Sequence, residues 1–96
     1  MGSWRLKVSK EMGKYNKLFT NILSGKNDQS IRFTELTHLL LAMGFNERIK
    51  GSHNIFYRHD IEEILNLQPN GSQAKAYQVR QVRNLILKYR LEEPNE

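Results

Sequence analysis

One histidine of this sequence lies among residues that could support cleavage of RNA. His53 follows the turn pair Gly51-Ser52, and the cations Arg48, Lys50 and Arg58 flank it along the chain. Metal-free RNA cleavage needs a base for the proton of a ribose 2′-hydroxyl and cations for the charge that builds on the phosphoryl oxygens. Histidine as a residue type suits proton transfer because it titrates near neutral pH. A lone histidine at the start of a strand is, however, more often a hydrogen-bonded surface residue.

A second candidate site is the glycine-containing loop 69–75 before the last predicted helix. Lys75 stands at the end of this loop, and Tyr77 follows in the first helical turn. Backbone N–H groups at a helix start together with an ammonium attract phosphate, and a tyrosine can stack on a base. Most such loops are ordinary connectors, and an aromatic residue there more often packs against a sheet.

The sequence gives little support for a metal site or for an activity that depends on cysteine. The chain contains no cysteine, and His38, His53 and His59 do not have the spacing of a zinc motif. We therefore expect no metal and no cofactor. His38 and His59 are weaker catalytic candidates, since they fall on the polar side of a helix and in a turn.

The charge of the chain favours a polyanionic partner. Fifteen basic residues against ten acidic ones give a net charge of +5, and the last five residues contain three glutamates. Nucleic acid is the obvious partner class for such a basic domain, although basic surfaces also serve solubility.

Apolar periodicity predicts three helices. The first is predicted at 12–23, and Gly25 belongs to the turn that stops it. The second begins with Thr34 as its N-cap, carries Glu35 in its first turn and ends at Gly44. The third runs from about 76 to 91.

Three strands are predicted between the second and third helices, at 45–50, 53–58 and 61–68. The first two alternate, and turn signals separate all three. The sequence therefore predicts an α+β, two-layer fold in the order α-α-β-β-β-α, with helices on one face of a three-stranded antiparallel sheet.

Ninety-six residues suffice for one domain. We expect this domain at 12–91, preceded by a basic arm at 1–11 that includes a run typical of cloning remnants, and followed by an acidic tail at 92–96. No signal peptide or membrane-spanning run is visible, so we expect a cytoplasmic protein without membrane contact.

Two segments of the chain resemble a known family. Gly44-Phe45, Arg48 and the run Gly51-Ser52-His53-Asn54-Ile55-Phe56 are similar to the GF…R…GSHxIF signature of the HicA, or YcfA-like, toxins. The segment Asn66-Leu67-Gln68-Pro69, followed by the run from Ala74 to Arg83, resembles a subgroup of that family. The resemblance covers about residues 14–91.

This resemblance implies a double-stranded-RNA-binding-like fold and an mRNA interferase, the toxin of a toxin–antitoxin system. It implies cleavage of single-stranded or messenger RNA, catalysis by the histidine of the GSH motif, here His53, and a HicB-like antitoxin that covers the active site. The RNA-binding residues that we predict are Arg48, Lys50, Gly51, Ser52, Lys75 and Tyr77.

The chain departs from the family in two places. Many members carry a V-P-x-H stretch after the third strand, where this chain has Gln68-Pro69-Asn70. The additional first helix could cover a sheet edge, contact RNA through Lys14 and Lys17, or bind the antitoxin.

Two other functions remain open at this point. A non-catalytic RNA-binding module would share the fold and the charge but leave RNA intact. An interaction protein with an acidic partner would bind RNA weakly and without the steep salt dependence of phosphate contacts.

Overall fold

The computed structural model describes residues 13–94 and confirms the predicted α+β architecture. Three α-helices and three strands follow one another in the order α-α-β-β-β-α, with a short 3₁₀ helix that the sequence did not predict. The elements are α2 (Asn16–Ser24), η1 (Asp28–Ser30), α3 (Phe33–Ala42), β1 (Asn46–Lys50), β2 (His53–Arg58), β3 (Ile61–Leu67) and α4 (Ala76–Tyr89). The predicted basic arm at 1–11 lies outside the described residues.

The sheet is an antiparallel meander with β2 in the centre. Its strand order is β1-β2-β3, and two-residue turns join the strands. Phe56 on β2 pairs with Glu47 on one side and with Leu65 on the other, and both Phe56 and Leu65 are buried. Because side chains alternate along a strand, every second residue of β2 and β3 faces the core and the residues between them face away.

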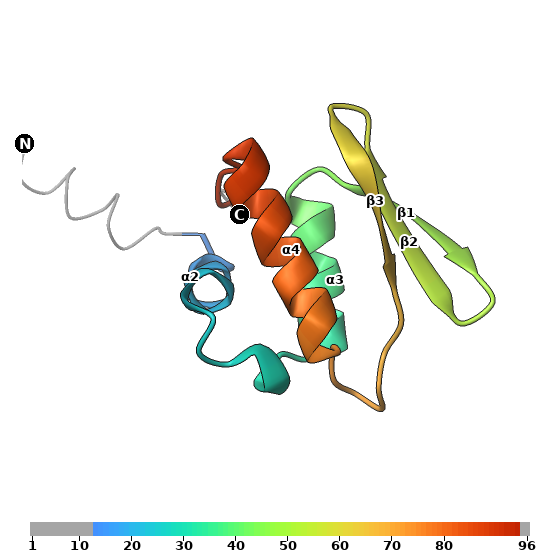
Figure 1. Ribbon diagram of the computed structural model, residues 1–96, viewed down its shortest axis with the longest axis horizontal. Helices are drawn as coiled ribbons and strands as arrows, with labels where there is room; N and C mark the ends of the chain where they lie inside the picture. The colour runs from blue at the N-terminus through green and yellow to red at the C-terminus, as the bar shows by residue number, and fades with distance from the viewer. Residues whose placement is uncertain (1–12, 95–96) are drawn as a thin grey trace, which may run out of the picture.

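The helices in the described part of the chain all lie on one side of the sheet (Figure 1). α3 and α4 cover its inner face, and α2 lies beyond α4, on the side remote from the strands. α2 is therefore packed against α4 and covers no edge of the sheet. The core between these elements is formed by the apolar faces of the helices and of β2 and β3, with the fully buried side chains Ile22, Leu36, Leu39, Leu40, Phe56, Leu67, Val79 and Val82.

Two predicted helix starts were wrong. α2 begins at Asn16 rather than at 12. Tyr15, just before it, does not have helical backbone angles, and the Asn16 N–H donates to the Gly13 carbonyl in a turn. α3 begins one residue before Thr34, with Arg32 at the N-cap position. The Glu35 carboxylate accepts the backbone N–H of Arg32 at 3.3 Å, which makes Thr34 unnecessary as a cap.

The predicted helix ends agree better with the structure. Gly25 terminates α2 with a φ of 73°, in the left-handed region where glycine is favoured. α4 ends at Tyr89, two residues before its predicted end. Beyond it, the Glu93 carboxylate accepts hydrogen bonds from the Asn16 amide at 3.0 and 3.1 Å, which ties the segment after α4 to α2.

Candidate functional site

The outer face of the sheet carries His53 and two of the predicted cations. Lys50 and His53 are paired across β1 and β2, and Arg48 is paired with Ile55 two residues further along. Their positions alternate with that of buried Phe56, so these side chains point away from the helices. Directly opposed residues in an antiparallel pair have Cβ atoms about 4.5–5.5 Å apart, which puts the Lys50 ammonium within reach of the His53 imidazole.

The Gly51-Ser52 turn fixes this pairing. Gly51 has a φ of 61°, as the first central residue of a two-residue hairpin loop of the glycine-dependent type requires. The Ser52 hydroxyl accepts a hydrogen bond from the Gln68 amide at 3.1 Å, which ties the loop to the end of β3. Gly51 and Ser52 thus determine where His53 lies.

Asn66 orients the His53 ring from the neighbouring strand. His53 Nδ1 lies 2.9 Å from Asn66 Oδ1, across the pairing between β2 and β3. An amide oxygen only accepts, so the proton of the neutral imidazole is on Nδ1 and Nε2 keeps its lone pair. Nε2 is therefore available as a base on the exposed face.

A shallow hollow of about 280 Å³ opens beside His53, where β3 meets the first turns of α4. Tyr77, half exposed, lines it together with His53, so two of the predicted residues meet here. The remaining lining residues are Ile64, Asn66, Gln68, Gln78 and Gln81. The hollow thus combines one imidazole, one aromatic ring and several neutral amides.

Gln78 holds α4 against the end of β3. Its side chain is only 1% exposed. In the amide orientation that gives both of its polar atoms complementary partners, it donates to the Gln68 carbonyl at 3.1 Å and accepts from the Gln68 N–H at 3.0 Å. The amide thus takes the place of a neighbouring strand: it bonds to the N–H and C=O of Gln68, which an edge strand would leave without partners. Gln78, rather than the preceding Tyr77, is therefore the residue that packs against the sheet.

The predicted cations are not all in the same place. Arg48 forms no ion pair within residues 13–94, and its guanidinium lies 6.0 Å from the centre of the Tyr57 ring on the outer face. Lys75 is the N-cap residue of α4 and does not line the hollow. Arg58 is engaged elsewhere, since it donates to Asp60 at 2.7 and 2.8 Å and to the Met43 carbonyl at 2.7 Å.

Two carboxylates near the start of β3 have strongly lowered pKa values. The Arg58 guanidinium, hydrogen-bonded to Asp60, lowers the pKa of that carboxyl to about 2. Glu63 accepts hydrogen bonds from the Lys88 ammonium and the Tyr89 hydroxyl, both at 2.6 Å, and these lower its pKa to about 2 as well. Both groups are ionised at neutral pH and already paired with a cation.

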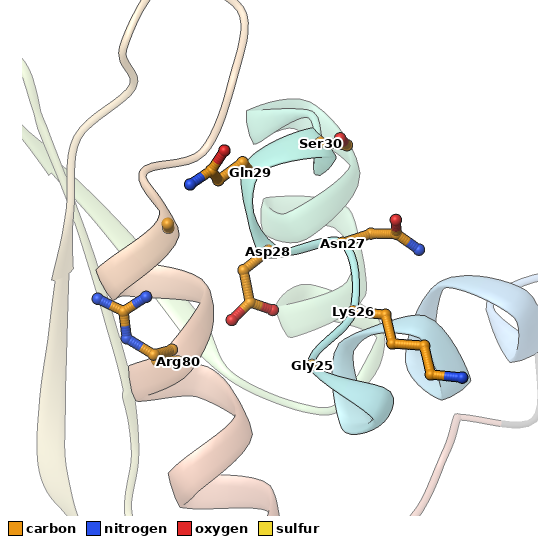
Figure 2. A pocket seen from close by; sticks show the side chains of 8 residues that line it. Gly25, Lys26, Asn27, Asp28, Gln29, Ser30 and Arg80 are labelled. Atoms are coloured by element: carbon orange, nitrogen blue, oxygen red, sulfur yellow. The ribbon is translucent and has the colours of Figure 1, made fainter.

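A larger hollow of about 340 Å³ lies away from His53, between the loop 25–30 and α4 (Figure 2). Asp28 points towards α4, and Lys26 points away from the hollow. The Asp28 carboxylate is held by the Arg83 guanidinium at 2.9 and 3.2 Å. This hollow contains no histidine and none of the predicted site residues, so its size does not make it the better candidate.

The other two histidines lie apart from this site. His38 is exposed on α3, and His59 is in the turn at the opposite end of β2 from His53. Within residues 13–94, no group of three potential metal ligands comes together. No helix in that part of the chain is both long and apolar enough to cross a membrane.

Sequence reasoning missed three residues of the site: Asn66, Gln78 and Gln81. Asn66 and Gln78 belong to the segments that resemble the HicA subgroup, but their roles depend on the register between β2 and β3 and on the rotation of α4. A strand alignment with Phe56 opposite Leu65 would have placed Asn66 on the face of His53. Gln81 lies in the same resembling segment, from Ala74 to Arg83, and nothing else in the sequence marks it.

Comparison with known proteins gave no relatives: no protein-family model, no curated protein and no solved structure matches this chain.

Proposed function

We propose that this protein is a metal-independent endoribonuclease of the HicA toxin kind, with His53 as its general base. The observation that carries the proposal is the hydrogen bond of His53 Nδ1 to Asn66, which leaves Nε2 free on an open face beside Lys50. The similarity of the GSH segment and of the segment around Tyr77 to that family supports it. A relation to double-stranded-RNA-binding domains is part of the same proposal.

The chemistry follows from this arrangement. Nε2 of His53 takes the proton of a ribose 2′-hydroxyl, and the 2′-oxygen attacks the adjacent phosphorus while the bond to the 5′-oxygen breaks. The leaving 5′-oxygen takes a proton from water, so the products are a 2′,3′-cyclic phosphate and a 5′-hydroxyl end. Lys50, with Arg48 further along the same face, stabilises the negative charge on the phosphoryl oxygens.

As the toxin of a toxin–antitoxin pair, the protein would have two partners. The substrate is messenger RNA in the cytoplasm, cleaved without help from the ribosome. A HicB-like antitoxin protein restrains the enzyme by covering the exposed sheet face around His53. The basic character of that face suits both RNA and an acidic protein surface.

The test is cleavage of labelled RNA by the purified protein in EDTA, with His53→Ala as the critical variant. Loss of the base should lower the rate about 10²–10⁴-fold. His59→Ala is the matched control, because His59 lies at the other end of β2 and should keep the wild-type rate. An undiminished rate in His53→Ala would overturn the assignment.

A non-catalytic RNA-binding module is the alternative function. Its supporting observation is the exposed pair of Arg48 and Tyr57, a cation and an aromatic ring next to each other on the sheet face. In the same assay, RNA that is retarded on a gel but remains intact in the presence of wild-type protein would favour this module.

A further inference from the structure

A single furrow runs from His53 along the seam between β3 and α4. The hollow beside His53 shares Ile64 and Gln81 with a second hollow of about 240 Å³. This second hollow is further lined by Glu63, Leu65, Asn84 and Leu85. The furrow therefore begins at the proposed general base and continues past the middle of α4.

One wall of the furrow is a stripe of α4. Tyr77, Gln81 and Asn84 stand at positions i, i+4 and i+7, which lie on the same face of a helix. All three are exposed, and neither the Gln81 nor the Asn84 side chain forms a hydrogen bond within residues 13–94. The stripe thus offers one aromatic ring and two amides with free donors and acceptors.

The furrow is almost neutral, in contrast to the face beside it. Glu63 is its only charged lining residue, and Lys88 compensates that charge at 2.6 Å. Arg48 and Lys50 lie on β1, across the central strand from β3. Phosphate groups are attracted to that cationic side, so an RNA strand bound at His53 would turn its bases towards the furrow.

A peptide strand fits the furrow less well than a base does. The edge of β3 is already hydrogen-bonded to α4 at both ends, by the Gln78 amide at Gln68 and by the Tyr89 hydroxyl at the Glu62 N–H, 3.3 Å away. An added strand would need this edge free over its length. A single nucleobase needs only the open stretch between these two anchors.

We propose that the furrow binds the nucleobase next to the scissile phosphate and makes cleavage selective for that base. Tyr77 stacks on the base, while Gln81 and Asn84 hydrogen-bond its edge, since an amide offers a donor and an acceptor side by side. This inference rests on the proposed ribonuclease function and adds specificity-determining residues to it.

The experiment compares cleavage of RNAs that differ at one position. Wild-type protein first cleaves an RNA pool with randomised positions, and sequencing of the product ends identifies the preferred base next to the cut. Four synthetic RNAs that vary only at this position then give kcat/KM for each base. The variants are Gln81→Met and Asn84→Leu, which remove the hydrogen bonds at similar size, and Tyr77→Ala.

We expect the ratio of best to worst base to fall about tenfold in Gln81→Met or Asn84→Leu, as the loss of a base contact implies. Tyr77→Ala should instead lower kcat/KM for all four RNAs, because stacking does not depend on the identity of the base. Gln29→Met is the control: it makes the same change at an exposed site on η1 and should keep the wild-type ratio.

Three outcomes would overturn the inference. Wild-type protein could cleave all four RNAs equally, or both amide variants could keep the wild-type ratio; in either case cleavage itself would still support the proposed function. If wild-type protein cleaves no RNA, the proposed function fails. Equal affinities of the four RNAs in a fluorescence anisotropy assay would then show that the furrow does not distinguish between bases, which overturns the inference as well.

Discussion

At the scale of single residues, the contact with Asn66 sets His53 apart from the other two histidines. His38 and His59 have no side-chain partner within residues 13–94, whereas the Asn66 oxygen holds Nδ1 of His53 at 2.9 Å. A fixed ring with a defined proton position is what a general base requires. Asn66 thus acts through His53 as a positioning residue.

Replacing Asn66 tests this role. Asn66→Leu should lower kcat for RNA cleavage about tenfold or more with little change in KM, because the free ring samples unproductive orientations. Asn66→Asp retains an acceptor for Nδ1–H and should recover most of the activity. Asn27→Leu, at an exposed loop position, serves as the control.

A merely structural role would give a different result. In that case both Asn66 variants would lose stability together, and the remaining folded protein would keep the wild-type kcat. Rescue by aspartate and a change confined to kcat are therefore the decisive observations.

At the scale of elements, the site depends on two connections. The β1–β2 hairpin places Lys50 opposite His53, and Gln78 binds α4 to the end of β3. The second connection gives the hollow its α4 wall, because Tyr77 and Gln81 flank Gln78 on the same helix. The position of α4 relative to the sheet thus depends on this buried amide together with the buried apolar face of the helix.

We expect Gln78→Leu to lower the free energy of unfolding by about 1–3 kcal/mol, because it leaves the N–H and C=O of Gln68 without partners. Urea denaturation followed by circular dichroism measures this change. Gln81→Met, on the exposed face of the same helix, should stay within about 0.5 kcal/mol of wild type. Equal stabilities of the two variants would contradict the structural role of Gln78.

At the scale of the whole molecule, all helices of residues 13–94 are on one side of the sheet, and none of them covers the other side (Figure 1). The open side carries Arg48, Lys50 and His53, while the carboxylates of Asp28, Asp60 and Glu63 are each paired with an arginine or a lysine. These three pairs cancel within themselves, so the open side keeps Arg48 and Lys50 as its cations, against the exposed carboxylate of Glu62 on β3.

The same ion pairs make the stability of the molecule depend on acid pH. The pKa of Glu63 is lowered from 4.5 to about 2 by its hydrogen bonds to Lys88 and Tyr89. A carboxyl whose pKa is lower in the folded state contributes stability above its unfolded pKa and loses that contribution as pH falls through the folded value. The Tm should therefore decline between about pH 4.5 and pH 2.

Differential scanning fluorimetry across this pH range provides the measurement, with Glu63→Gln as the variant. The decline in Tm should be smaller in Glu63→Gln, although not absent, because Asp60 titrates over a similar range against Arg58. Parallel Tm curves for the two proteins would show that the contact of Glu63 with Lys88 contributes nothing measurable.

The type and order of the elements could be predicted from the sequence alone. Leu36, Leu39 and Leu40 predicted α3 through their helical period, and the alternation from His53 to Arg58 predicted β2, because burial of one face imposes these periods directly on the chain. Helix starts were predicted less well, since Glu35 caps α3 in a way that no local preference for Thr34 reveals.

The assembly of the site, by contrast, depends on tertiary contacts that the sequence did not predict. The GSH segment singled out His53, but the contact with Asn66 exists because β2 and β3 pair in one register, with Ile55 opposite Asn66. The rotation of α4 then exposes Tyr77 and buries Gln78, and it separates Lys75 from the hollow. Register and helix rotation depend on contacts between residues far apart in the chain, so a local pattern cannot encode them on its own.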